Sequence, residues 1–348
     1  MLKQYLIVFL VIAVLLGIII GYAGHLSIKS ELLPIEIKEE AENKSLQSGA
    51  ISESVKDVAS DLLFFSLQEE LVHLLESKDN SVTNIAEEYL KFARISGLYD
   101  QLRVIDGNGM EIIRINFNNG KPLIVPHGQL QNKKNRYYFS RTFELNRGEV
   151  YISPFDLNIE KDEIEKPIKP MIRFATPIFD SKGKKLGIVI LNYFGSKMIK
   201  RLKDGATGTS TEISLVNSDG YWFFSPNPED NWGFMYEEKK DKTFGNKYHK
   251  AWERISKEES GQFYTENGFF TFSTVYPLKE AEKLTARLVG LKRQTSGISK
   301  AGSYYWKTIS HIPKKTVQQR RNTITKKFVI FYLEVLTLLS LVSWFLLR

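Results

Sequence analysis

The chain has 348 residues, with 48 Lys and Arg against 40 Asp and Glu, so its formal net charge at neutral pH is +8. It contains no cysteine, which excludes disulfides and thiolate metal sites. The five histidines lack metal-binding spacing such as H-E-x-x-H, and neither a Walker loop nor a nucleophile elbow occurs, so we predict no metal, no cofactor and no enzymatic activity.

The first predicted element is an apolar helix. Seventeen uncharged residues, YLIVFLVIAVLLGIIIG, begin at Tyr5, which is long enough to cross a bilayer core. A cleaved signal peptide is the alternative, but this run is long for one and the A-G-H step after it is a poor cleavage site. We therefore predict an uncleaved transmembrane helix at residues 5–23.

Residues 24–97 have the pattern of a helical stalk. Pro34 is expected to break or start its first long helix, and Ser54-Val-Lys-Asp57 resembles a capping box ahead of an apolar stripe. A second helix is expected from about Ser81 to Ser96, ending before Gly97. The stripe consists of Val55, Val58, Leu62, Phe65, Leu67, Leu71 and Leu74.

Strand patterns follow the stalk in two similar sets. LRVIDGNGMEIIRINF, from Leu102, predicts a hairpin, and ISLVNSDGYWFFS, from Ile213, repeats its pattern a domain length later. Each set continues into further strands: RFATPIFDSKGKKLGIVILNYF in the first, GQFYTENGFFTFSTVYPL and YYWKTISHI in the second. We predict two copies of one α+β unit, at residues 98–205 and 206–313.

A second apolar segment lies near the C-terminus. The twenty residues FVIFYLEVLTLLSLVSWFLL, from Phe328, carry one charge, Glu334, and predict a transmembrane helix at residues 325–347. We predict that Glu334 contacts a partner helix, with snorkelling to the membrane interface as the alternative.

Basic residues ahead of this segment bear on orientation and partners. Six Lys or Arg lie between Lys314 and Lys327, whereas only Arg348 follows, a bias that alone would place this side in the cytoplasm. Long domains translocate largely regardless of charge, so we predict an extracytoplasmic domain on a two-pass protein of the bacterial inner membrane. We expect the basic stretch to meet lipid head groups and predict no nucleic-acid partner.

The ordered set of motifs between the apolar segments resembles the double Cache sensor domain of bacterial transmembrane receptors, especially sensor histidine kinases and diguanylate cyclases. The motifs are YDQLRVIDGNGMEIIR, NRYYF, GEVYISPFDLN, RFATPIFDSKGKKLGIVILNY, FTFSTVYPL and YYWKTISHIP. The resemblance implies a long stalk helix that carries two PAS-like antiparallel-sheet domains, membrane-distal and membrane-proximal, with a small extracellular ligand in the distal one.

The resemblance also implies a ligand site. In amino-acid-binding members an Arg, an aromatic pair and a later Tyr and Asp hold the ligand's carboxylate and amine. This chain departs from that pattern, with a Tyr pair in place of a Trp-Tyr pair one residue later, so we expect a carboxylate- or amine-bearing ligand without assigning an amino acid. The matching positions are Arg136, Tyr137, Tyr138, Tyr151 and Asp156, with Arg173 as a further candidate.

Structural roles are the alternatives for these positions. The tyrosines could be core, Arg136 could pair with Glu144, and Asp156 could build an Asx turn. The second unit shows no similar polar set, so its aromatic residues are expected to pack. They are Trp222, Phe223, Phe224 and Trp232.

We therefore predict a membrane-anchored small-molecule sensor that lacks its own output domain, because no kinase, cyclase or methyl-accepting signature is found. Its expected partners are a second copy, paired along the stalk, and a separate histidine kinase or cyclase. The alternative is a ligandless envelope scaffold or decoy receptor. A membrane-anchored hydrolase would need a triad or metal cluster, and the sequence shows neither.

Overall fold

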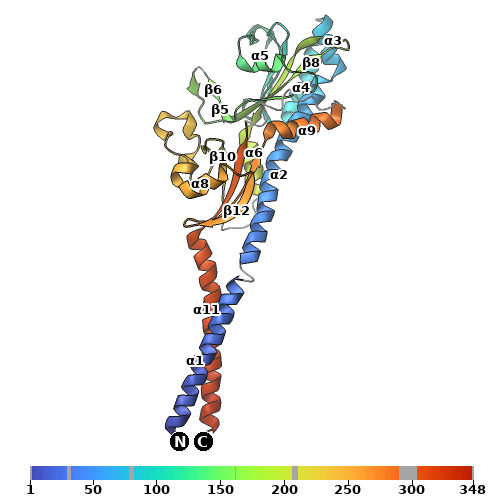
Figure 1. Ribbon diagram of the computed structural model, residues 1–348. Coiled ribbons are helices and arrows are strands. Elements are labelled where there is room, and N and C mark those ends of the chain that lie inside the picture. Colours follow the sequence, from blue (N-terminus) through green and yellow to red (C-terminus); the bar gives the residue numbers. More distant parts are fainter. Residues whose placement is uncertain are drawn as a thin grey trace.

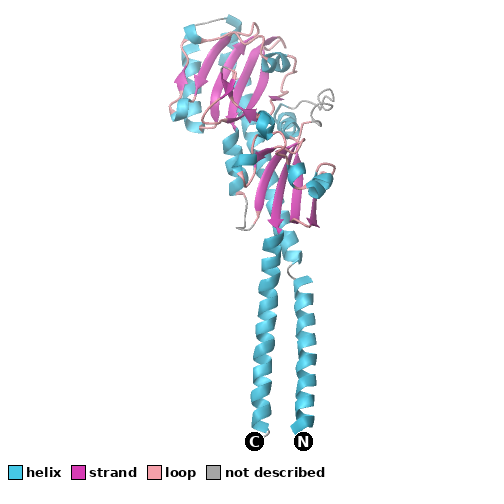
Figure 2. Ribbon diagram, turned by 90° about the vertical axis from the view of Figure 1, so that its left-hand side faces the viewer, coloured by secondary structure: helices cyan, strands magenta, loops and turns pink. Residues whose placement is uncertain are grey.

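The computed structural model describes residues 2–29, 33–77, 82–160, 162–205, 211–289 and 304–346. Two antiparallel sheets lie one beyond the other along a long helix, and two further helices extend side by side from the lower sheet (Figure 1, Figure 2). We call the sheet farther from this helical pair the distal sheet and the nearer one the proximal sheet.

The helices follow the expected order. α1 (Leu2–Ser27) and α11 (Lys314–Leu346) contain the two apolar segments. α4 (Val82–Ser96) ends before Gly97, whose φ of +56° is the left-handed cap conformation that glycine favours. The remaining helices are α2 (Leu33–Ser66), α3 (Glu69–Ser77), α5 (Tyr137–Phe143), α6 (Gly195–Asp204), α7 (Phe244–Lys247), α8 (His249–Ile255) and α9 (Pro277–Val289).

The predicted capping box at Ser54 is wrong. α2 is continuous from Leu33 to Ser66, and the Ser54 hydroxyl donates to the Ala50 carbonyl inside the helix at 2.8 Å. The turns before Ser54 are held by tertiary contacts, since the Gln47 amide donates to Ser310 Oγ of the proximal sheet at 2.7 Å. Packing thus overrides a local helix-start signal. Leu67 also departs from the predicted stripe: it follows the end of α2 and is 53% exposed.

The distal sheet has seven strands in the order β3-β2-β1-β9-β8-β4, with β5 also paired to β8, and β6 and β7 form a separate hairpin. All neighbours are antiparallel. One face packs on α2 and α4, and α5 lies over the other. The strands are β1 (Tyr99–Asp106), β2 (Glu111–Asn116), β3 (Leu123–Ile124), β4 (Tyr151–Ile152), β5 (Asp156–Leu157), β6 (Ile159–Glu160), β7 (Glu163–Ile164), β8 (Pro170–Phe179) and β9 (Lys185–Phe194).

The proximal sheet has five antiparallel strands in the order β11-β10-β14-β13-β12. The same order recurs in the distal sheet as β2-β1-β9-β8-β4, so in both sheets the last strand lies in the middle, next to the first hairpin. This agrees with two copies of one α+β unit. The strands are β10 (Glu212–Asn217), β11 (Trp222–Phe224), β12 (Ser260–Thr265), β13 (Gly268–Val275) and β14 (Trp306–Pro313).

Three hairpin turns share one geometry. In each, an Asp or Asn side chain accepts from the backbone N–H groups two and four residues later, at 2.7–3.0 Å. A glycine three residues after it has a φ of +84° or +85°. The pairs are Asp106 with Gly109, Asp180 with Gly183, and Asn217 with Gly220.

The stretch between β13 and β14 begins with α9, which lies against α2. Residues 290–303 lie outside the described part of the chain, as does the predicted domain boundary at 206.

Candidate ligand-binding site

α5 covers one end of the outer face of the distal sheet with an apolar contact. Tyr138 and Phe139 of α5 are buried against Ile105, Ile188 and Ile190, from β1 and β9. Strand alternation turns these isoleucines to the same face, and the stacked ring of Phe143 extends the contact. This end of the face is therefore filled core.

The other end of the same face is polar. Arg103 of β1 lies two residues before Ile105, so its side chain faces the same way, and it is only 6% exposed. Its guanidinium donates to Tyr138 Oη at 3.1 Å and to Asn192 Oδ1 of β9 at 2.9 Å, and it lies over the Tyr138 ring. Tyr138 thus joins the apolar cover to a buried cation.

Glu111 is the anion closest to this cation. Its carboxylate accepts from Arg114 at 3.1 Å and from the Gln131 N–H at 3.0 Å, and it lies 3.8 Å from Arg103 Nη1. Two guanidinium groups therefore share one fully buried carboxylate. Burial lowers the pKa of nearby Lys133, and the charges of Arg103 and the other arginines here act in the same direction.

Buried polar atoms without partners gather on this face. Nine such side-chain atoms occur in the described part of the chain, and five belong to this face or its edge. An unpaired buried polar atom costs about 1–3 kcal/mol, so the accumulation needs water or a ligand to satisfy it. The five are Arg103 Nε, Glu111 Oε1, Arg114 Nε, Asn116 Oδ1 and Tyr151 Oη.

Arg173 and Asp156, both predicted from the sequence, form an ion pair. Arg173 of β8 donates to Asp156 Oδ1 at 3.1 Å and to Asn158 Oδ1 at 3.1 Å. The pair is mostly buried, with 12% and 25% of the two side chains exposed. Burial raises the pKa of Asp156, although the charge of Arg173 opposes that shift. Asp156 is thus held beside a guanidinium at the edge of the polar face.

Tyr151 and Tyr137 lie beside this ion pair. Burial raises the pKa of Tyr151 to about 12, and the nearby Arg141 only partly offsets it. The Tyr151 hydroxyl is buried and has no hydrogen-bond partner of good geometry among the described residues. Tyr137 is 45% exposed, and burial of the rest of its ring raises its pKa, with Arg173 and Asp156 both close enough to act on it.

Arg136 stands apart from these predicted residues. It is exposed, occupies the N-cap position of α5 and has no side-chain partner within the described ranges, Glu144 included. The structure therefore brings Tyr137, Tyr151, Asp156 and Arg173 together and places Arg136 at the rim. Ligand contact by the six predicted residues stays a prediction.

The buried charges of this face were not identified from the sequence. Arg103, Glu111, Arg114 and Asn192 come from three strands, and Arg103 bonds to a residue 89 positions away. The available signal was a charged or amide residue inside alternating apolar strands, as in L-R-V-I, I-I-R-I and I-L-N-Y. Such a residue on a strand covered on both faces is expected to have a partner or a function.

The loop that carries Asp156 also joins the two sheets. The ring of Phe155, next to Asp156, lies 4.7 Å from Phe223 and 5.0 Å from Trp232, and its N–H donates to Tyr304 Oη at 2.8 Å. The aromatic residues predicted to pack in the second unit do so: Trp222, Phe223 and Trp232 are 2–3% exposed, and Phe224 is half-buried.

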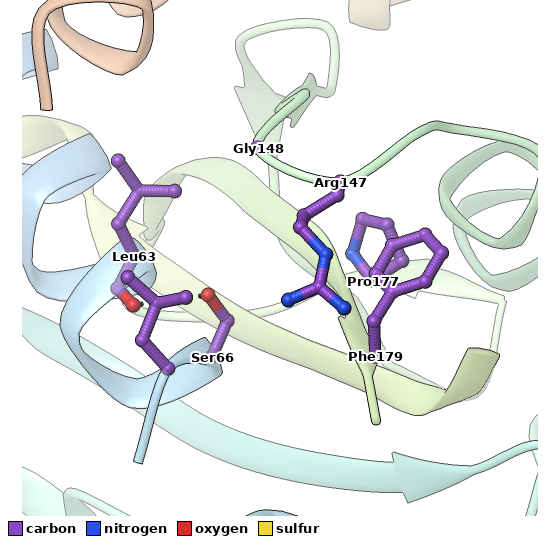
Figure 3. A pocket seen from close by; sticks show the side chains of 7 residues that line it. Leu63, Ser66, Arg147, Gly148, Pro177 and Phe179 are labelled. Carbon is purple, nitrogen blue, oxygen red and sulfur yellow. Dashed lines mark hydrogen bonds between the residues drawn. The ribbon is translucent and has the colours of Figure 1, made fainter. Parts of the chain in front are cut away.

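A small cavity lies elsewhere in the distal unit (Figure 3). It is about 10 Å³, room for about one water molecule, and we assign no ligand to it. Its lining residues are Leu63, Ser66, Leu67, Arg147, Gly148, Pro177 and Phe179. No group of three or more His, Cys, Asp or Glu suited to a metal ion occurs among the residues with described positions.

The two apolar helices are long enough to cross a membrane, over Ile7–Ser27 and Lys314–Phe345. They pack through α1 glycines, since Gly17 faces Tyr332 and Gly24 faces Phe328, and Tyr332 Oη donates to the Ala13 carbonyl at 2.9 Å. Glu334 lies on an exposed face of α11, and no ion pair or hydrogen bond to it occurs within the described ranges. Its predicted contact with a partner helix stays a prediction.

Comparison with known proteins gives one family match. The family described as bacterial histidine kinase, sensor domain, matches residues 51–286, about two-thirds of the chain. No curated protein matches the sequence.

Several solved structures share the fold. The extracellular domain of the putative histidine kinase vpHK1S-Z8 is 20% identical, with a TM-score of 0.63 and coverage of 82% of this chain and 98% of that one. A domain of a putative sensory box/GGDEF family protein from Vibrio parahaemolyticus is 20% identical, with a TM-score of 0.60 and coverage of 80% and 99%. At these identities the likeness concerns the fold alone.

Proposed function

Because the chain belongs to the family of bacterial histidine kinase sensor domains, we propose that it is a membrane-anchored extracytoplasmic sensor that binds a small molecule in its distal domain. The observation that carries this proposal is the set of five unpartnered buried polar atoms on the outer face of the distal sheet. In a core with no ligand to bind, replacing these groups by apolar ones would be the more stable solution.

The charges of this face favour a ligand with a carboxylate. Three guanidinium groups, of Arg103, Arg114 and Arg173, face two carboxylates, of Glu111 and Asp156, which leaves one positive charge uncompensated. A guanidinium offers a carboxylate two parallel donors. Tyr151 can add a hydroxyl, and Asp156 can accept from an amine on the same ligand.

In this proposal, the residues predicted to contact the ligand form the rim and edge of the site. Tyr137, Tyr151, Asp156 and Arg173 would surround the ligand, Tyr138 would hold Arg103 in place, and Arg136 would close over it from the N-terminus of α5. We propose that residues 98–205 form the distal domain and residues 206–313 the proximal domain.

We propose that the signal passes through α2 and Phe155. α2 contacts strands of both sheets, and Phe155 packs against the proximal aromatic residues directly beside Asp156. A ligand that binds one arrangement of these parts more tightly shifts the population toward it. α1 and α11 would span the inner membrane and carry the change to a histidine kinase or cyclase. Two copies of this chain would pair along the stalk as a homodimer.

A thermal-shift screen of the full-length chain in lipid nanodiscs tests the proposal. The panel contains amino acids, organic acids, amines, purines and sugars. A ligand at 100 times its dissociation constant should add about 2.7 kcal/mol, or roughly 5–10 °C. Arg173→Met should abolish the shift. Arg94→Met, an exposed arginine near the end of α4, serves as the control and should keep it.

Two results would contradict the proposal. A shift that survives in Arg173→Met and in Asp156→Asn would move the ligand away from this face. No shift with any compound, in a protein that unfolds cooperatively, would favour the ligandless scaffold instead.

A further inference from the structure

A second, larger cavity lies in the proximal unit, on the sheet face covered by α7 and α8. Its volume is about 200 Å³. A protein cavity of about 150 Å³ can hold benzene, so this one has room for a ring and a small polar group. Aromatic side chains of Trp222, Phe244 and Tyr248 form part of its wall. No local sequence pattern indicates this cavity, because its lining comes from separate strands and helices.

The carboxylate in the cavity wall already has a partner. Glu212 Oε2 lies 3.0 Å from His311 Nδ1, and the other ring nitrogen lies 3.1 Å from the Asn267 carbonyl. Each ring nitrogen therefore lies within hydrogen-bond distance of an acceptor, Glu212 on one side and the Asn267 carbonyl on the other. The Glu212 charge is thus held within the wall, and the ring of His311 is fixed by stacking on Phe270 at 4.3 Å.

Lys247 supplies the cation of the wall. Its ammonium lies 3.2 Å from Asp230 Oδ2, and Asp230 is shared with Lys242 at 3.9 Å. An ammonium has three protons, so Lys247 keeps donors for another acceptor. It also lies over the rings of Trp222 and Tyr248, at 5.6 and 5.7 Å. A cationic ligand would meet Lys247 on the aromatic faces it would need.

Ser214 adds a polar group to the cavity wall. Its side chain lines the cavity, the residue is only 7% exposed, and its hydroxyl has no hydrogen-bond partner in the described part of the chain. The Tyr248 hydroxyl also lines the cavity, and it likewise has no hydrogen-bond partner among those residues. Two hydroxyl groups and a lysine therefore line one cavity with aromatic walls.

We propose that this cavity is a second ligand site, which binds a small organic carboxylate with an apolar body. The carboxylate would accept from Lys247 and from the hydroxyls of Ser214 and Tyr248, while Trp222 and Phe244 would contact the body. This site differs from the distal one in position and in residues, so it does not depend on the function proposed above.

Isothermal titration of the full-length chain in nanodiscs with benzoate tests this proposal, beside benzamide and benzylamine as ring-matched neutral and cationic probes. We expect benzoate to bind, and both other probes to bind at least about tenfold more weakly, because a hydrogen bond to a charged group is lost. Lys247→Met should weaken benzoate binding about ten- to a hundredfold. Lys250→Met is the matched control, since Lys250 is 68% exposed and pairs with Glu266 at 3.1 Å.

Ser214→Ala is a second variant that should fold normally, because its hydroxyl has no partner to lose. It should bind benzoate more weakly with an unchanged or higher melting temperature. The proposal is overturned if benzoate does not bind, if benzylamine binds best, or if Arg173→Met removes benzoate binding while Lys247→Met does not. In the last case the probe would be in the distal site.

Discussion

Tyr151 and Tyr89 are both turned inward, but only one hydroxyl has a partner. Tyr89 donates to Gln68 Oε1 at 2.6 Å, whereas the buried Tyr151 hydroxyl has no partner of good geometry among the described residues. Tyr151→Phe should therefore leave the free energy of unfolding unchanged or raise it, while Tyr89→Phe should lower it by about 1 kcal/mol. Urea unfolding measures both. Equal losses in the two variants would mean that Tyr151 is an ordinary bonded core residue.

Glu212 should make stability depend on pH in a predictable direction. Its hydrogen bond from His311 holds the pKa of this carboxyl below the ordinary value of 4.5, so the ionised form stabilises the fold. That stabilisation is complete above 4.5 and is lost as the pH falls through the lowered pKa. Wild type should exceed Glu212→Gln in stability near neutral pH and approach it in acid. Glu229→Gln, 79% exposed, is the control and should show no such convergence.

At the scale of elements, two glycines with the same backbone conformation make a matched pair. Gly109 and Gly183 have φ values of +85° and +84°, but a Cβ on Gly109 would lie 2.6 Å from Lys134 Cα, whereas Gly183 faces open space. Gly183→Ala should cost about 1–2 kcal/mol for the left-handed conformation alone. Gly109→Ala should cost more, because the main chain of the loop leading to α5 must move. Denaturant unfolding compares them, and equal costs would contradict the close contact.

Local chemistry explains which elements were predictable. The hairpin turns depend on one Asx side chain and one glycine, and α4 depends on its own periodicity and Gly97, so short stretches of sequence suffice. α2 begins next to Pro34, as predicted, but the capping box at Ser54 was wrong because contacts such as that of Gln47 with Ser310, 263 positions away, hold the helix continuous through this point. The predicted rim of the distal site came from one continuous segment. Its floor, with Arg103 and Asn192, depends on sheet register that no local pattern determines.

At the scale of the whole molecule, Phe155 is the contact expected to couple the two sheets. Its side chain is 1% exposed and lies among Phe223, Trp232 and Trp306. Phe155→Ala should lower the free energy of unfolding by about 3–5 kcal/mol. Hydrogen exchange should then speed up both around Asp156 and in β11. Phe244→Ala, buried among proximal residues, should affect the proximal sheet alone. Unchanged hydrogen exchange around Asp156 in Phe155→Ala would show that Phe155 does not couple the two sheets.

The exposed face of α11 is where a second copy is expected to bind. Tyr332 and Phe328 pack on α1, whereas Glu334 and Leu338, one turn apart, face away from it, Leu338 being 66% exposed. An ionisable side chain at membrane depth is stabilised by a polar partner. Because the chain has no cysteine, single cysteines report on this face without background.

Leu338→Cys should give a disulfide-linked dimer in native membranes, seen on a non-reducing gel. The half-buried neighbour Leu339→Cys should give little, since that side of α11 faces α1. Adding Glu334→Leu should weaken the Leu338→Cys dimer about fivefold if Glu334 contributes roughly 1 kcal/mol between helices. Efficient cross-linking that Glu334→Leu does not change would favour the alternative, in which the glutamate snorkels to the membrane interface. Cross-linking through Leu339→Cys instead would place the second copy on the face that α1 occupies here and overturn this arrangement of the spans.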